Sequence, residues 1–255
     1  MCIKCIRIKA SKEREDKILK TNENFLLIDT ETANSLNFPL PYDIGYKIMN
    51  RKGEVKVSRS FCIYEIFVLQ REMMKSAYYA DKLPEYEQGI NAKKMTLVRF
   101  YTARKTILKD MEEYKTNTVY AYNISFDRRA LNNNQKFTTE NRYKYFFPKD
   151  TEFRCIWHMA CQVLLSRPSY IKMALNNNWV SEKGNILTNA ECCYRYITKN
   201  IEFEEAHKGL DDVNIEAEIL LKCFAQHKKM KTQPYTACWR IVQKKKEEIN
   251  RGALK

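Results

Sequence analysis

The sequence of 255 residues lacks any long apolar run. The best candidate, residues 61–69, is interrupted by Glu65 and is much shorter than the about 20 residues that a membrane-spanning helix requires. No segment resembles a secretion signal, and no internal repeat or low-complexity tract is present. These absences argue against a membrane-embedded or exported protein, and we expect a soluble, cytoplasmic one.

The chain also lacks the regular cysteine spacing of a disulfide-bonded protein, although it has nine cysteines. An odd number of scattered cysteines does not form a disulfide framework, so we expect reduced thiols. Cys2 and Cys5 have half the spacing of a zinc knuckle, but no second pair with ligand spacing follows. The pattern Cys155-x-x-His158-x-x-Cys161 has helical spacing among apolar neighbours, so we interpret it as part of the core.

Acidic residues are fewer than basic ones: 31 Asp and Glu against 45 Lys and Arg give a net charge of +14. Residues 1–20 carry seven basic and three acidic side chains, a net charge of +4, and residues 227–255 carry nine basic and two acidic ones, a net charge of +7. The remaining residues therefore carry a net charge of only +3. Lys and Arg release condensed counterions when they neutralise phosphates. The charge therefore favours a polyanionic partner, although solvated lysine tails would give the same pattern.

Hydrophobic periodicity predicts several strands. Residues 25–32 form an apolar run that leads directly into acidic residues, as in a buried strand. Residues 41–50 and 55–64, with a turn signal at residues 51–54, indicate an antiparallel meander. Residues 119–125 indicate a second buried strand that enters a helix.

Helical spacing appears at residues 66–83, 96–114 and 204–227, with a loop expected at residues 88–94. Strands and helices that alternate around one mixed sheet place the chain in the α/β class. We divide the chain into a basic N-terminal extension (1–23), one domain (24–226) and a basic C-terminal extension (227–255).

Acidic residues stand where both buried strands end. Asp29 and Glu31 are two residues apart on one strand, so their side chains point to the same face. Two like charges so placed favour a bound cation. Asp127 follows the second buried strand, where it would also suit the first turn of a helix as a capping acid.

The final helix carries a further acid on its apolar face. Asp212 lies in the middle of the apolar arc, whereas Asp211 lies about 100° away from it. A buried carboxylate without a partner is costly, and a metal ion is the simplest partner. Glu216 shares that arc, so the pattern favours Asp212 without proving it.

Together these residues resemble the DEDDh (DnaQ-like) 3′-to-5′ exonucleases of the RNase H-like superfamily. Three motifs occur in order within residues 24–226: Asp29-Thr30-Glu31, Asn123-Ile-Ser-Phe-Asp127, and His207 with Asp212 five residues later. Lys208 stands where the tyrosine variant of the family has Tyr, so the chain resembles the histidine variant.

The resemblance implies an RNase H-like fold, with a mixed central sheet flanked by helices, and metal-dependent hydrolysis of a terminal phosphodiester. Carboxylate oxygens suit Mg²⁺ or Mn²⁺, and two such ions activate water and neutralise the leaving oxygen. By resemblance, Asp29 would bridge both ions, Glu31 and Asp212 would complete the site of the water-activating ion, and Asp127 would support the second ion through water. His207 would accept the proton of the attacking water.

The implied substrate is the 3′ end of single-stranded DNA or RNA. Backbone groups of Thr30, Glu31 and Thr32 are expected near the terminal nucleotide, and Asn123 and Phe126 are expected to shape the pocket floor. Phe126 would equally suit plain core packing. The family commonly follows the first motif with Thr or Ser and then Gly, whereas this chain has Thr32 and then Ala33. This difference predicts a different backbone course beside the nucleotide.

Two other functions fit the same residues. One is a binding module that holds nucleic acid or a protein without cleaving it, and the other is an endonuclease or RNase H-like enzyme of the same superfamily. All five catalytic positions are filled, which argues against the first, and the spacing of the motifs argues against the second. Any polymerase or replication partner would be a separate chain.

Overall fold

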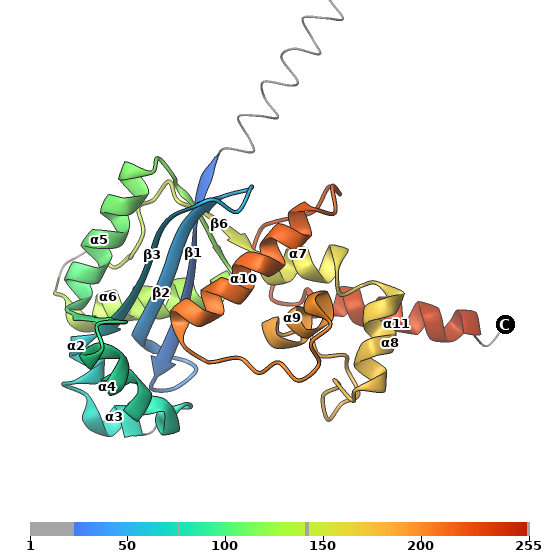
Figure 1. The fold of residues 1–255 in the computed structure, drawn as a ribbon, viewed down its shortest axis with the longest axis horizontal. Helices are drawn as coiled ribbons and strands as arrows, with labels where there is room; N and C mark the ends of the chain where they lie inside the picture. Colours follow the sequence, from blue (N-terminus) through green and yellow to red (C-terminus); the bar gives the residue numbers. More distant parts are fainter. Residues whose placement is uncertain (1–22, 76, 141–142, 254–255) are drawn as a thin grey trace, which may run out of the picture.

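The computed structural model describes residues 23–75, 77–140 and 143–253. Its centre is a mixed six-stranded sheet with the strand order β4-β3-β2-β1-β5-β6 (Figure 1). Antiparallel pairs join β1 to β2 and β2 to β3, whereas β4, β5 and β6 each run parallel to a neighbour. The strands are β1 (Asn24–Ala33), β2 (Leu40–Asn50), β3 (Val55–Ile63), β4 (Thr96–Val98), β5 (Thr118–Ala121) and β6 (Glu152–Cys155). The predicted α/β class and the antiparallel meander are confirmed.

Helices cover both faces of this sheet (Figure 1). Shared buried side chains place one set on one face: α5 (Phe100–Glu113), α6 (Ile124–Thr138) and, at one end, α2 (Tyr64–Phe67), α3 (Arg71–Lys75) and α4 (Leu83–Asn91), with the 3-10 helix η1 (Ala80–Lys82) directly before α4. The other set comprises α7 (Ile156–Val163), α8 (Pro168–Asn176), α9 (Ala190–Thr198), α10 (Gly209–Phe224) and α11 (Trp239–Ala253). Within the second set, α10 crosses β1 and β2, and α7 and α9 pack beside it. None of the helices in the described part of the chain combines the length and the apolar character that a membrane crossing needs.

The central strand β1 is buried on both faces. Phe25 and Leu27 pack into the core beneath α7 to α11, while Leu26 and Ile28 pack into the core beneath α5 and α6. Because successive strand residues point to opposite faces, burial on both sides requires the unbroken apolar run of the sequence. The same alternation places the side chains of Asp29 and Glu31 on the face of the sheet that α10 covers.

Several predicted elements differ in the structure. The single helix expected at residues 66–83 is divided into α2, α3 and η1. The helical pattern at residues 96–114 begins as β4, because residues 96–98 pair with the edge of β3, and the helix starts only at Phe100. The expected loop at residues 88–94 overlaps α4. The final helix begins at Gly209 rather than at residue 204, since His207 adopts a left-handed backbone conformation with φ of 51° that a right-handed helix does not accommodate.

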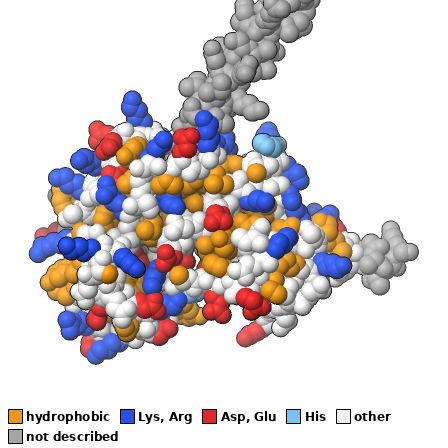
Figure 2. Space-filling model, viewed as in Figure 1, with side chains coloured by type: hydrophobic (Ala, Val, Ile, Leu, Met, Phe, Trp, Pro, Cys, Tyr) orange, Lys and Arg blue, Asp and Glu red, His pale blue; other side chains and the backbone are white. Residues whose placement is uncertain are grey.

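The C-terminal segment packs onto the rest of the protein. Cys238 and Val242 are fully buried in the core beneath α7 and α8. The Gln243 side chain accepts a hydrogen bond from the Ile186 backbone N–H and donates one to the Ile186 carbonyl, both at 3.0 Å. Helix α11 is therefore part of the packed body, and the division of the chain at residue 227 remains a prediction. Lys and Arg side chains are spread across the whole face shown in Figure 2, interspersed with acidic ones.

The cysteine predictions have separate outcomes. Cys155, His158 and Cys161 are buried, and His158 Nδ1 lies 2.8 Å from the Gln233 carbonyl, so the interpretation of this pattern as core is confirmed. Cys2 and Cys5 lie outside the described residues, together with nearly all of the predicted N-terminal extension.

Candidate active site

The end of β1 places the first two acidic side chains. In the antiparallel pair with β2, Asp29 lies opposite Gly45 and Glu31 lies opposite Asp43, and the register shifts directly after Glu31. Both carboxylates share the strand face of Phe25, as the periodicity predicts. They therefore emerge from the sheet on the side where α10 begins.

The third predicted acid comes from the first turn of α6. Asp127 is only 4% exposed, and its Oδ1 accepts a hydrogen bond of 3.0 Å from Thr30 Oγ1 on β1. Asn123, not Asp127, occupies the position before the first helical residue, and its side chain makes no capping hydrogen bond. Asp127 is thus held by the strand that carries Asp29, which ties the first motif to the second.

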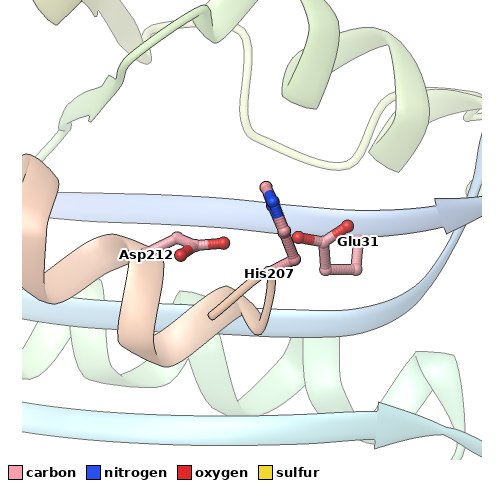
Figure 3. A group of neighbouring side chains, drawn as sticks. All are labelled: Glu31, His207 and Asp212. Atoms are coloured by element: carbon pink, nitrogen blue, oxygen red, sulfur yellow. The ribbon is translucent and has the colours of Figure 1, made fainter. Parts of the chain in front are cut away.

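The last two predicted residues come from the start of α10. His207 lies in the loop just before the helix, and Asp212 lies in its first turn with 7% of its surface exposed, whereas Asp211 is exposed. Ligand atoms of Glu31, His207 and Asp212 all lie within 4.8 Å of one another. Figure 3 shows the Glu31 and Asp212 carboxylates directed toward each other, with His207 between them. The helical pattern thus distinguished the buried acid from its neighbour.

Two glycines let α10 approach the sheet at this point. A Cβ atom on Gly45 would lie 2.0 Å from the Gly209 carbonyl carbon, and one on Gly209 would lie 2.6 Å from the Gly45 nitrogen and 3.2 Å from the Asp29 carbonyl oxygen. Backbone therefore packs directly on backbone where the helix starts. This contact brings Asp212 to the end of β1, and sequence periodicity alone did not indicate it.

Asp43 is a buried carboxylate that the sequence reasoning missed. Its Oδ2 accepts hydrogen bonds of 2.9 Å from the Tyr86 hydroxyl and from the Gly209 backbone N–H. The Tyr86 hydroxyl also lies 3.4 Å from the His207 carbonyl oxygen. Asp43 thus fastens the start of α10 to β2, and an acid in the middle of a buried strand was the signal that could have revealed it.

Two more acidic residues adjoin the predicted set. Glu216 lies on α10 one turn after Asp212 and is 3% exposed, and Glu205 lies in the loop before His207. Both line the same cavity as the predicted residues. The apolar arc of the final helix had already placed Glu216 beside Asp212, whereas no pattern pointed to Glu205.

An open cavity of about 630 Å³ collects these side chains. Its lining includes every residue that the sequence assigned to the site: Asp29, Thr30, Glu31, Thr32, Asn123, Phe126, Asp127, His207 and Asp212. Tyr78 and Tyr79, from the segment before η1, close one side of it. The structure therefore brings together all the predicted positions, and the role of each one remains a prediction.

The electrostatics of this cavity favour a cation. Burial raises the pKa of Asp29 well above its usual value, and the negative charges of Asp127 and then Glu216 raise it further. Burial, helped by the charges of Asp212 and Asp43, raises the pKa of Glu31 to about 9. Burial also raises the pKa of Asp127 and that of Asp212 to about 7. These shifts show how strongly the fold opposes so much unbalanced negative charge, and a divalent ion would balance it.

The donor set fits a hard divalent metal ion. Carboxylate oxygens are the ligands that Mg²⁺ and Mn²⁺ prefer. Two of these oxygens, Asp212 Oδ1 and Glu216 Oε2, are buried and have no hydrogen-bond partner. Unpartnered buried acceptors are costly in a folded protein, and coordination to a cation would satisfy them.

No protein-family model matches this chain, and no curated protein matches it by sequence. Solved structures that share its fold include two with a TM-score of 0.50. One is the zinc-bound form of E. coli exonuclease I in complex with single-stranded DNA, at 12% identity over 81% of this chain and 41% of that chain. The other is a full-length 3′-exonuclease, at 11% identity over 85% of this chain and 88% of that chain. This chain thus spans about two fifths of the length of the exonuclease I chain. The RNase H-like exonuclease fold is confirmed.

Proposed function

We propose that this protein is a metal-dependent 3′-to-5′ exonuclease that hydrolyses the terminal phosphodiester bond of single-stranded DNA or RNA. The observation that carries the proposal is the convergence of four carboxylates and one histidine, from β1, α6 and the start of α10, in one open cavity. The order of the three motifs and the fold shared with two exonucleases support it. The complex of E. coli exonuclease I with single-stranded DNA supports a single-stranded substrate.

Asp29, Glu31, Asp127 and Asp212 would hold the two Mg²⁺ or Mn²⁺ ions. When bound, such ions supply an activated water and neutralise the charge that develops on the leaving oxygen. The unpartnered Asp212 Oδ1 and the raised carboxylate pKa values favour this assignment. The hydrogen bond from Thr30 to Asp127 holds one of the four carboxylates in a fixed orientation.

His207 would accept the proton from the attacking water. A base must be neutral to accept a proton, and burial, followed by the positive charge of Lys82, lowers the pKa of His207 below its usual 6.5. The fold therefore favours the neutral imidazole at physiological pH. Its place beside Glu31 and Asp212 would put it next to a water bound at that end of the site.

Phe126 offers a surface for the terminal base. Its ring is half-buried and lines the cavity, and the Arg129 guanidinium lies 5.5 Å from the ring centroid. Aromatic rings beside a basic group stack on bases without regard to sequence. Thr32 and Asn123 also line the cavity and would contact the nucleotide, and the Thr30 side chain serves Asp127 instead.

Digestion of 5′-labelled single-stranded DNA and RNA, side by side with Mg²⁺, Mn²⁺ or EDTA, tests the proposal. An exonuclease shortens the strand progressively from its 3′ end with either metal and is inactive with EDTA. A 3′-terminal phosphate should block it if the cavity accepts a free 3′ hydroxyl. Internal cuts from the first time points would indicate an endonuclease, and strand binding without cleavage would indicate a binding module.

A further inference from the structure

Glu216 is a buried carboxylate that is not among the four acidic residues of the family motifs. It is 3% exposed, it lines the cavity, and its Oε2 has no hydrogen-bond partner. Burial raises the pKa of Glu216 well above its usual value, and the charge of Asp127 raises it further. A buried, unpartnered carboxylate oxygen therefore belongs to a residue that lines the cavity.

Its position on α10 accounts for this orientation. Residues four apart on a helix share a face, so Glu216 lies one turn above Asp212 on the side that meets the sheet. Its neighbours on the helix, Ile215 and Ala217, are buried, and an apolar side chain would pack between them without an unpartnered polar atom. A carboxylate at this position is costly unless something positive or a proton donor meets it.

Glu216 adjoins the acidic side chains of the proposed site. Asp29, Asp127 and Glu216 line the same cavity. Ligand atoms of Glu31, His207 and Asp212 lie within 4.8 Å of one another, and Asp212 is one turn before Glu216 on α10. Beyond burial, the charges of Asp127 and Glu216 raise the pKa of Asp29, and the charge of Asp127 raises that of Glu216.

We infer that Glu216 is a fifth carboxylate ligand of the divalent-cation site. The inference rests on the proposed function, because it takes the cavity to be a metal site. It gives the site five acidic groups in place of the four that the family resemblance supplies. The consequence is tighter retention of the cation there, since affinity for hard cations increases with the number of charged ligands.

The test measures Mn²⁺ binding to the full chain, by electron paramagnetic resonance of free Mn²⁺, for the wild type and for Glu216→Gln. The amide keeps the size of the side chain and removes its charge. Glu218→Gln is the matched control, because Glu218 is exposed on the same helix and its Oε1 accepts a hydrogen bond of 3.2 Å from the Tyr194 hydroxyl. We expect Glu216→Gln to weaken one of the two Mn²⁺ affinities by about tenfold or more, and Glu218→Gln to leave both affinities unchanged.

Thermal melting supplies a second measurement that is independent of activity. Without metal, Glu216→Gln should melt no lower than the wild type, because the amide keeps the size of the side chain and removes a carboxyl group whose charged form burial opposes. With saturating Mn²⁺ its gain in melting temperature should be smaller than that of the wild type. If Glu216→Gln does not fold, Glu216→Asp, which keeps the charge and withdraws it by one methylene, should fold and still bind Mn²⁺ more weakly.

The outcomes separate this inference from the exonuclease proposal. Wild-type Mn²⁺ affinity and an unchanged metal-induced melting shift in Glu216→Gln, or in Glu216→Asp where the first variant is unfolded, would overturn the inference, whatever the wild type does to a labelled strand. A wild type that cleaves no strand, together with a Glu216→Gln variant that loses Mn²⁺ affinity, would refute the exonuclease and leave the fifth ligand in place.

Discussion

The ring of Tyr79 stacks on the imidazole of His207, with the ring centroids 4.0 Å apart and an angle of 14° between the planes. The contact joins the segment before η1 to the loop before α10, which are far apart in the sequence. Lys82 strengthens the same junction, because its Nζ donates a hydrogen bond of 2.6 Å to the Ala206 carbonyl. The orientation of the proposed base is therefore set by a segment outside the three motifs.

Replacing Tyr79 with alanine should lower kcat by roughly 10- to 100-fold, since loss of the stack frees the His207 ring from its working position. Tyr79→Phe keeps the ring and should retain most of the activity. Steady-state digestion of a labelled strand separates the two variants. Equal loss in Tyr79→Phe and Tyr79→Ala would show that the hydroxyl, not the stack, is what matters.

Activity should rise with pH through the pKa of His207 and then level off. Because burial and Lys82 lower that pKa, the midpoint should lie below 6.5 and the rate should be nearly constant above pH 7. His207→Ala should lose about 10² to 10⁴ in rate at saturating metal while its affinity for the strand barely changes. Rates close to those of the wild type between pH 6 and 8 would contradict a role as base.

Single replacement of Asp29, Glu31, Asp127 or Asp212 by alanine should abolish cleavage and leave the protein folded. Asp211→Ala is the matched control for the last of these, since Asp211 is adjacent in sequence but exposed. Without metal, the Asp29, Glu31 and Asp212 variants should melt no lower than the wild type, because each removes a carboxylate whose charged form burial opposes, whereas Asp127→Ala also loses the hydrogen bond from Thr30. Equal loss of activity from Asp211→Ala and Asp212→Ala would contradict the assignment.

Gly45→Ala should disrupt the junction between α10 and the sheet. The added Cβ would lie 2.0 Å from the Gly209 backbone, so the helix start must shift away from Asp29. We expect a loss of about 1 to 3 kcal/mol in the free energy of unfolding, measured by urea denaturation, together with a large loss of activity. Gly89→Ala is the control: it lies in α4, where the nearest atom to an added Cβ is Met95 Cβ at 4.0 Å, and it should not destabilise the protein.

Lysines after residue 227 should bind the nucleic-acid strand at a site remote from the cavity. Removing the whole segment would also remove buried side chains of α11, so replacing charges is the better test. Lys228→Gln with Lys229→Gln should reduce the slope of log affinity against log salt by about 0.7 for each lost phosphate contact. The exposed pair Lys105 and Lys109 on α5 provides the matched control. An unchanged slope in the first variant would refute this binding surface.

The sequence by itself determined the elements whose burial shows in their own periodicity. The apolar run before Asp29 predicted a strand buried on both faces, and the helical arc distinguished Asp212 from Asp211. Both predictions agree with the structure, because the alternation of a strand and the 3.6-residue period of a helix are properties of a single segment. The α/β class followed from the succession of such segments.

Only the tertiary structure decided which segments meet. The contact of Gly45 with Gly209, the hydrogen bonds of Asp43 and the stack of Tyr79 on His207 each join residues distant in the chain. Periodicity indicates which face of an element is covered and does not indicate what covers it. For the same reason, the buried acid at position 216 was visible on its helix from the sequence, while its place beside Asp29 and Asp127 came from the packing of α10 across the ends of two strands.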